Sequence, residues 1–359
     1  MVIVELDEPV IAEHRERLAD GVEVCTAKLA KSPERLRFGP AYRLIRRIRA
    51  DIGVFVKGWP QVATVSLDLA CRLAFRGSFL TIEQLAPPYR GPKSTGRHFG
   101  GLIPGLGLWW YAAGLKLYVR SIFPKRIVTV SRAIASELVQ HYGFPIIKVV
   151  PISNGIDAKR FAPDRAARVK VRASWGVPEG AIVFGTVSRL SNFHKGLDIA
   201  IDMFAQLCAA NPDRLLWCVL VGSGPDDATL KSQARATEWS SRILFPGPTE
   251  RPWEVCCGID VFLMPSHFEG MPLALLEGMA CGCCPVVMGV GGITEIVCDA
   301  TLGWLAPPDD REAFLRGMQA ALALGADGRA AMGARVRQHV IEHFAEEQFG
   351  KLADLIERC

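Results

Sequence analysis

The second half of the chain alternates short apolar runs with segments of helical periodicity. The runs, predicted to be strands, lie at 181–188, 216–222, 242–247, 260–266 and 285–290. Apolar residues at helical spacing predict an amphipathic helix after the first run. They are Leu197, Ile201, Phe204 and Leu207. This alternation predicts an α/β domain whose parallel sheet is covered on both faces. Ligands of such sheets bind in the loops at the carboxyl ends of the strands.

The first half shows the same alternation more weakly. Its predicted strands are 1–6, 22–27, 52–56, 77–82 and 126–130, and two helices are predicted at 40–50 and 61–75. Ser131 is a suitable N-cap for a further helix, whose apolar side includes Ile134 and Leu138. The segment 148–157 leaves a strand through a turn-forming Asn-Gly pair. We therefore place a domain boundary there.

Length and charge support two domains with different partners. The chain has 359 residues, of which 50% are hydrophobic, more than a single core usually serves. Residues 1–150 carry 22 basic and 12 acidic side chains, and the remainder carries 20 and 25. A basic first half is typical of contact with an anionic acceptor or membrane surface, but also of a solvated basic face. Nothing points to nucleic acid as a partner.

The cysteines indicate a reduced protein. Their number, 11, is odd and their spacing fits no disulfide framework. Cys281 and Cys284 have the spacing of redox and zinc motifs, but no second pair or histidine cluster completes a metal site. Core packing at a helix end is the favoured interpretation, and a metal or redox role is the alternative. We expect neither a metal nor another cofactor.

The apolar segments are too short to cross a membrane. The first ten residues lack the layout of a signal peptide, and no uncharged apolar run reaches about 18 residues. Residues 102–115 come closest, with Trp109, Trp110 and Tyr111 next to several cations. This composition is typical of an interfacial segment, and a buried helix with a basic end is the alternative. We expect a cytoplasmic protein, with peripheral contact to the inner membrane face left open.

The segment 266–277 combines a helix start with two carboxylates. Pro272 suits the first position of a helix that runs to Cys281, and Gly282 suits its end. The free amides of the first turn, at Leu273 and Ala274, then form an anion site. Glu269 precedes this turn and Glu277 lies inside the helix. Since carboxylates accept strong hydrogen bonds from hydroxyl groups, the pattern suits a diphosphate with sugars on both sides.

Other strand ends add cations and glycines. Arg189 and Lys195 follow the strand 181–188, where they suit phosphate oxygens and would neutralise a diphosphate without a metal. The alternative is that Arg189 and Lys195 are ordinary surface cations without a ligand. Gly222 and Gly224 are only a weak indication of dinucleotide binding, because the third glycine of that fingerprint is missing. Gly291 and Gly292 permit close approach of backbone to a ligand, and the nearby Glu295 is a candidate helix cap.

These motifs, taken in order, resemble the family-four retaining glycosyltransferases. The resemblance rests on Arg189 with Lys195-Gly196, Gly222-Ser-Gly-Pro, the run from Ser266 through Glu269 to Glu277, and Gly291-Gly-Ile-x-Glu. It extends from about residue 126 to the C-terminus. It implies the GT-B fold, in which two Rossmann-like doubly wound domains face a cleft. The implied domains are 1–153 and 164–340, joined by a linker at 154–163, with a helix in 341–359 crossing back to the first domain.

The resemblance also implies roles at the site. Arg189, Lys195 and Glu269 would be catalytic, with the two cations on the donor diphosphate and Glu269 on the transferred sugar. Glu277 would bind the ribose of the nucleotide. The remaining donor-binding residues would be Ser266, Gly270, Met271, Pro272, Leu273, Gly222 and Gly224. The implied reaction moves a sugar from a nucleotide-sugar donor to a glycan or lipid-linked acceptor, with retention and without a metal, in polysaccharide or glycolipid assembly.

The first residues depart from the family pattern. MVIVEL looks like the family's second strand, so the N-terminal domain is expected to lack its first strand–loop–helix unit, which carries a glycine-rich loop. On the acceptor side only Glu83 and His98 are candidates. A donor-binding but inactive homologue that acts as a partner or regulator is therefore the alternative function. A GT-B-like epimerase or phosphorylase fits less well, and a nicotinamide oxidoreductase least.

Overall fold

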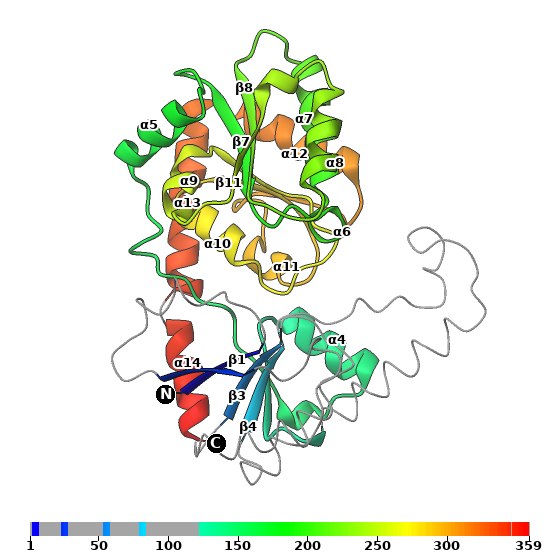
Figure 1. Cartoon of the computed structure of the whole chain (residues 1–359), viewed down its shortest axis with the longest axis vertical. Coiled ribbons are helices and arrows are strands. Elements are labelled where there is room, and N and C mark those ends of the chain that lie inside the picture. The colour runs from blue at the N-terminus through cyan, green and yellow to red at the C-terminus, as the bar shows by residue number, and fades with distance from the viewer. Residues whose placement is uncertain are drawn as a thin grey trace, which may run out of the picture. The chain divides into compact units, whose positions relative to one another are not determined.

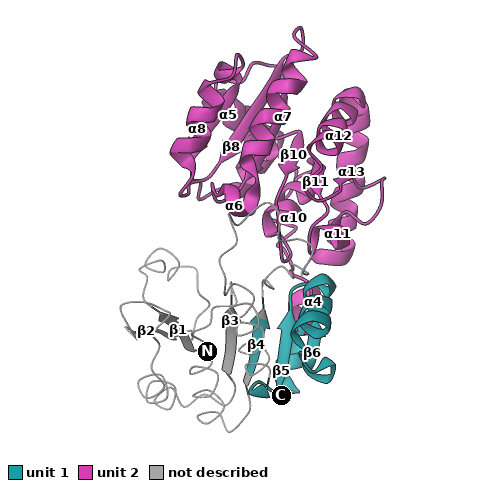
Figure 2. Ribbon diagram, turned by 90° about the vertical axis from the view of Figure 1, so that its right-hand side faces the viewer, with its two compact units in different colours: residues 1–152, 352–359 teal, residues 153–351 magenta. Residues whose placement is uncertain are grey.

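The chain divides into two compact units in the computed structural model (Figure 1). They comprise residues 1–152 with 352–359, and residues 153–351 (Figure 2). The structure describes residues 2–6, 23–27, 53–57, 79–83, 122–345 and 347–358. The boundary predicted after residue 153 lies next to this division, while the linker and the other predicted bounds stay predictions.

The second unit contains one parallel sheet of six strands. Its strands are β7 (Ile182–Val187), β8 (Leu216–Val221), β9 (Ile243–Gly247), β10 (Val261–Met264), β11 (Cys284–Met288) and β12 (Trp304–Ala306). Their order across the sheet is β12-β11-β10-β7-β8-β9. This is the Rossmann order, in which the direction of winding reverses between the first and fourth strands. Here the reversal lies between β7 and β10, so the loops after these two strands lie at the switch point.

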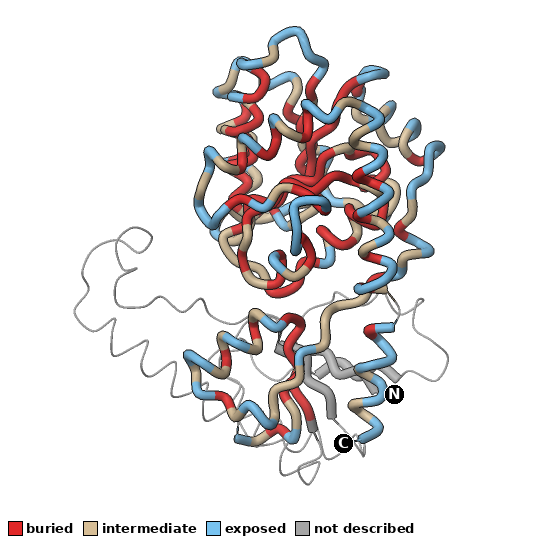
Figure 3. Tube along the Cα trace, turned by 180° about the vertical axis from the view of Figure 1, so that it is seen from behind, coloured by how far each residue is buried: buried red, intermediate tan, exposed pale blue. Residues whose placement is uncertain are grey.

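Helices cover both faces of this sheet (Figure 1). They are α5 (Arg165–Ser174), α6 (Asn192–Lys195), α7 (Leu197–Ala209), α8 (Asp227–Arg235), α9 (Pro252–Gly258), α10 (Leu273–Ala280), α11 (Ile293–Ile296), α12 (Arg311–Ala323) and α13 (Gly325–Phe344). Alternate strand residues such as Phe184 and Leu263 join Phe204 of α7 and Phe314 of α12 in a fully buried core (Figure 3). The predicted helical spacing in α7 is confirmed, since its four predicted apolar residues are buried.

The first unit contains a second parallel sheet. Its order is β3-β4-β5-β6, with β3 at Gly53–Lys57, β4 at Phe79–Glu83, β5 at Arg126–Thr129 and β6 at Val149–Pro151. Two further strands, β1 (Val2–Leu6) and β2 (Glu23–Ala27), pair in parallel with each other. Helix α4 (Arg132–Tyr142) begins as predicted, because the Ser131 hydroxyl accepts a hydrogen bond from the Ile134 amide at 3.2 Å.

Some predictions for the first half lie outside the described residues. These are the helices at 40–50 and 61–75 and the segment 102–115, and the absence of a first strand–loop–helix unit also stays a prediction. The last helix, α14, spans Glu347–Glu357, close to its predicted range. In the part of the chain that the structure describes, no helix is both long and apolar enough to cross a membrane.

Three details of the second unit differ from the sequence prediction. Pro272 is the N-cap of α10, with an extended backbone at φ −73° and ψ 111°, and is not its first helical residue. The predicted last residue, Cys281, is likewise the C-cap. The three-residue strand β12 was not predicted, because a run that short has no readable periodicity.

Candidate functional site

The loops after β7 and β10 meet through a partly buried ion pair. The Lys195 ammonium lies 2.6 Å from Oε1 of Glu269, and the Ser266 hydroxyl donates to the same oxygen at 2.7 Å. The Glu269 side chain is 8% exposed and that of Lys195 is 22% exposed. The two residues are 74 positions apart in the chain, and the neighbouring strands β7 and β10 bring them together. The predicted residues Lys195, Ser266 and Glu269 therefore form one cluster at the switch point.

The short helix α6 sets the position of Lys195. It ends at Lys195, and Gly196 follows in the left-handed conformation with φ 56°. A Cβ atom on Gly196 would lie 2.3 Å from the Pro265 carbonyl oxygen, so only glycine lets these two loops approach so closely. The His267 amide also donates to the His194 carbonyl at 3.0 Å. Backbone contacts thus hold the loop after β7, called the Lys195 loop, against the loop after β10, called the Glu269 loop.

Positive charge gathers on the loop after β7. Arg189 is exposed there and lies close enough to His194 to act on it electrostatically. Burial lowers the pKa of His194, as do Lys195 and Arg189, while Glu269 opposes them. Neighbouring cations therefore favour the neutral imidazole. Arg189, Lys195 and Glu269 thus all lie close enough to His194 to act on it electrostatically.

The loop after β11 packs against the backbone of Glu269 and Gly270. Gly291 has φ 51°, and a Cβ atom there would lie 1.8 Å from the carbonyl oxygen of Glu269. The Gly292 amide donates to the Gly270 carbonyl at 2.9 Å. The side-chain amide of Asn154 donates to the Met271 carbonyl, also at 2.9 Å. The carbonyls of Gly270 and Met271 are thus occupied by protein donors, which fixes the path of the loop.

The start of α10 offers amide groups. The Leu275 amide is the first to bond within the helix, to the Pro272 carbonyl at 3.2 Å, and no side chain caps the turn. The amides of Leu273 and Ala274 precede this first bond, which leaves them outside the helical ladder. Leu273 is 46% exposed, whereas Met271 is buried. Anion binding at this terminus stays a prediction, and Pro272 lies one position earlier than predicted.

Glu277 lies on the same helix, half-buried in its second turn. Burial raises the pKa of its carboxyl group, and the Arg160 guanidinium partly opposes this. The ionised side chain therefore destabilises the folded unit until it gains a partner. A pair of ligand hydroxyl groups would supply such a partner.

We predict that Glu277→Gln raises the melting temperature at pH 7 and changes it little near pH 4. The raised pKa means that the folded state holds its proton to higher pH than the unfolded state does. The charge therefore lowers stability only as pH rises above the unfolded-state value. Differential scanning calorimetry at both pH values tests this. A lower melting temperature at pH 7 would contradict it.

Gly222 and Gly224 serve the packing of the loops. A Cβ atom on Gly222, which has φ 143°, would lie 1.9 Å from the Ser188 carbonyl oxygen. One on Gly224 would lie 2.2 Å from that of Leu190. The loop after β8 thus lies directly on the loop after β7. Donor contact by these two glycines stays a prediction, and their small size has this structural reason as well.

The candidates for the acceptor side stay predictions. His98 lies outside the described residues. Glu83 ends β4, of which the structure describes the backbone at that position, in register with Lys57 and Thr129.

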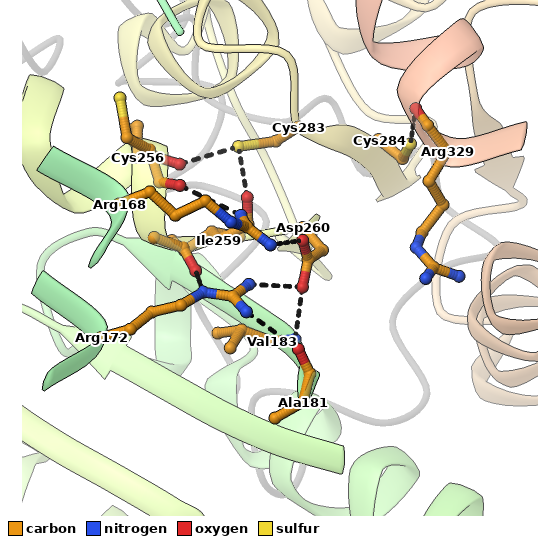
Figure 4. Close-up of polar contacts among 12 residues, drawn as sticks. Arg168, Arg172, Ala181, Val183, Cys256, Ile259, Asp260, Cys283, Cys284 and Arg329 are labelled. Atoms are coloured by element: carbon orange, nitrogen blue, oxygen red, sulfur yellow. Dashed lines mark hydrogen bonds and ion pairs between the residues drawn. The ribbon is translucent and has the colours of Figure 1, made fainter. Parts of the chain in front are cut away.

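A second polar cluster lies before β10, at the amino ends of the strands (Figure 4). Asp260 accepts from Arg168 and Arg172 at 2.5 Å each and from the Val183 amide at 2.8 Å. It borders a groove of about 830 Å³ between α5 and the first turns of α13. Parallel α/β sheets bind their ligands at the carboxyl edge, and here the charged groups satisfy one another. The cluster therefore joins α5 to the sheet and is no candidate for the chemistry.

The thiols of the predicted Cys-x-x-Cys pair are buried and free. Cys281 caps α10, which confirms packing at a helix end, and the Cys284 thiol donates to the Arg329 carbonyl. Within the described ranges, no group of three or more histidine, cysteine or acidic side chains is arranged to hold a metal.

Sequence reasoning missed one contact at the site. Nδ1 of His267, in the loop after β10, lies 2.9 Å from Oδ1 of Asp309 in the loop after β12. Asp309 has φ 61° and is the one described non-glycine residue with a positive φ. The Pro-Pro-Asp-Asp sequence at 307–310 was the available signal, since it is typical of a turn.

Comparison with known proteins identifies related chains. The family model described as glycosyl transferases group 1 matches residues 168–339, and that described as glycosyltransferase family 4 matches residues 8–160. A D-inositol 3-phosphate glycosyltransferase of Saccharomonospora viridis is 30% identical over 223 residues, which are 60% of this chain and 51% of the relative. The GDP-mannose-dependent alpha-(1-6)-phosphatidylinositol monomannoside mannosyltransferase of Mycolicibacterium smegmatis is 31% identical over 243 residues, 64% and 61% of the two chains.

A solved structure shares the fold. Anabaena HepE in complex with UDP superposes with a TM-score of 0.78 at 18% identity, covering 100% of this chain and 92% of that one. The predicted GT-B fold, with two parallel-sheet α/β domains, is confirmed. The matched part of the chain spans 51% and 61% of the length of the two curated relatives named above.

Proposed function

We propose that this chain, which belongs to the glycosyltransferase family whose models match residues 8–160 and 168–339, transfers a sugar from a nucleotide-sugar donor to an acceptor hydroxyl group. The observation that carries the proposal is the Lys195–Glu269 ion pair at the switch point, 2.6 Å long and beside the start of α10. A cation, a carboxylate and free helix amides suit a ligand that presents both phosphate and hydroxyl groups. The names of the relatives, which are glycosyltransferases, support the same activity.

The residues divide the work as follows in this proposal. Arg189, Lys195 and the amides at Leu273 and Ala274 stabilise the charge that develops on the leaving diphosphate, without a metal. Glu269 accepts hydrogen bonds from the transferred sugar, and Glu277 from the ribose. The acceptor oxygen forms the new bond to the anomeric carbon while the bond to phosphate breaks. The acceptor proton passes to the leaving phosphate, and the anomeric configuration is retained.

The donor and acceptor classes belong to the same proposal. Anabaena HepE is named as a complex with UDP, and the mycobacterial relative is named for GDP-mannose and a phosphatidylinositol acceptor. These names support a UDP- or GDP-sugar donor and a glycan or lipid-linked acceptor.

A thermal-shift screen with UDP-glucose, UDP-galactose, UDP-N-acetylglucosamine and GDP-mannose tests donor binding. A donor at about 100 times its Kd should stabilise the protein by about 2.7 kcal/mol. Binding of none of these sugars would contradict the proposal. Binding without release of nucleoside diphosphate, over a panel of glycan and lipid acceptors, would favour the inactive-homologue alternative.

We further propose that the first unit contacts an anionic membrane surface, where a lipid-linked acceptor resides. Ile146 and Ile147 are 71% and 81% exposed, and the neighbouring Lys148 ammonium donates to the carbonyl of Ile122, itself 50% exposed. Residues 122–152 carry four basic and one acidic side chain. Exposed aliphatic groups beside cations suit the interface of an anionic bilayer.

We predict that Ile146→Ser/Ile147→Ser weakens binding to vesicles containing phosphatidylserine about tenfold, since two aliphatic side chains no longer enter the interface. Co-sedimentation measures this. Ile341→Ser, which changes an isoleucine that is 38% exposed on α13, is the control and should bind as the wild type does. Equal binding by all three proteins would contradict the proposal.

A further inference from the structure

The strongest unexplained feature beside the donor site is the Asp309–His267 contact. The Asp310 amide donates to the Pro307 carbonyl at 3.1 Å, which closes a four-residue turn. With Pro308 second and a positive φ at the third residue, this is the pattern of a type II turn. Glycine or asparagine is usual at that third position, because a side chain adds strain there that only asparagine and aspartate partly relieve through local hydrogen bonds. This chain has Asp309 there, with φ 61°.

Contacts of Asp310 and Arg311 anchor the C-terminal side of the turn. Asp310 caps α12 by accepting from the Ala313 amide at 2.8 Å. Arg311 reaches Asp198 and Asp202 of α7 at 3.2 Å each. These contacts hold the turn whichever residue occupies position 309. The strained residue is therefore not needed to place the turn, and its carboxylate requires a different explanation.

The Asp309 carboxylate reaches the residue that joins the two loops of the site. His267 donates its backbone amide to His194, and its ring lies beside Gly196, where a Cβ atom would be 3.4 Å from Nε2. The next residue, Phe268, packs its ring against that of His194 with 4.4 Å between centroids. Residue 267 thus touches the Lys195 loop while it belongs to the Glu269 loop. A group that orients its ring acts on both.

We propose that Asp309 and His267 are positioning residues that hold the Lys195 and Glu269 loops in the geometry that binds the donor diphosphate. Asp309 accepts the Nδ1 proton of His267 and fixes the ring against Gly196. The backbone strain at Asp309 is retained for the sake of this contact, as strained residues near functional sites often are. The inference rests on the function proposed above, because the donor is what the two loops bind.

The contact is modest in strength. The Asp309 side chain is 67% exposed and that of His267 is 23% exposed, so water screens the pair. We therefore expect donor affinity to fall about three- to fivefold when the contact is lost, the range typical of an exposed pair.

The test compares three single variants and one double variant of the full chain. Asp309→Gly removes the carboxylate and relieves the strain, so it should leave the melting temperature unchanged or higher while donor affinity falls. Asp309→Asn keeps an acceptor for Nδ1 and tolerates the positive φ, so it should bind the donor almost as the wild type does. His267→Phe should lose as much affinity as Asp309→Gly, and the double variant should lose no more than either.

Isothermal titration calorimetry with whichever of UDP-glucose or GDP-mannose the wild type binds measures these affinities. Unchanged affinity in Asp309→Gly would overturn the inference and leave the proposed function standing. A lower melting temperature in Asp309→Gly would also overturn it, because the pair would then be a stabilising contact only. If the wild type binds neither nucleotide sugar nor any other in the thermal-shift screen, the proposed function fails, and the inference fails with it.

Discussion

Asp260→Ala is expected to lower the free energy of unfolding of the second unit by about 3 kcal/mol, near the lower end of the range for breaking a buried ion pair. The Asp260 carboxylate is the shared partner of Arg168 and Arg172 and of the Val183 amide. Its removal leaves the Arg172 guanidinium, 12% exposed, without its counter-charge. Burial already lowers the pKa of Arg172, which indicates how poorly its charge is solvated. Because Arg168 is 36% exposed, water compensates that part of the loss.

Urea unfolding at pH 7 measures this change as a shift of the midpoint at constant slope. Asp227→Ala is the matched control, since Asp227 pairs with Lys231 on the surface of α8 at 39% exposure. An exposed pair of this kind contributes about 0.5 kcal/mol or less. Similar losses in the two variants would show that Asp260 acts as an ordinary surface charge. Folded Asp260→Ala protein should bind nucleotide sugar normally, because Asp260 precedes β10 and the donor loops follow it.

The sequence predicted the strands well, because each is a local apolar run. All five predicted strands of the second unit are found, with bounds that differ by a few residues at most. It also located Lys195 and Glu269 at the ends of strands. What it left open was their contact, which depends on β10 lying next to β7 although two other strands separate them along the chain. Strand order is a tertiary property that local periodicity does not contain.

The Asp260 cluster was beyond reach for the same reason. Its two arginines are 92 and 88 positions away from it in the chain, and three strands lie between them and Asp260 in the sequence. Gly222 shows a different limit. A glycine after a strand predicts close approach of something, and the sequence does not say whether that is a ligand or, as found here, the Ser188 carbonyl. The positive φ of Asp309 is likewise a property of the folded turn, and the residue type alone does not predict it.

Lys195→Ala is expected to weaken binding of both nucleotide sugar and free nucleoside diphosphate by about 1.5 to 3 kcal/mol, or about 10- to 150-fold. The Lys195 ammonium lies 2.6 Å from Oε1 of Glu269. In the proposed function the ammonium contacts the diphosphate, which is present in both ligands. Isothermal titration calorimetry with UDP and UDP-glucose, or with GDP and GDP-mannose, measures the two losses. Lys231→Ala is the matched control, because it removes a lysine from a more exposed pair in the same unit.

Glu269→Gln separates the two halves of the site. The substitution removes the charge that competes with phosphate for Lys195, so free nucleoside diphosphate should bind as tightly as before or more tightly. It also replaces the carboxylate that the transferred sugar is proposed to contact, which should cost about 1.5 to 3 kcal/mol for the nucleotide sugar. The ratio of the two affinities should therefore fall at least tenfold. If the affinities for both ligands fall equally, Glu269 supports the loop and does not contact the sugar. If neither changes, the ion pair lies outside the donor site and the proposed function loses the observation that carries it.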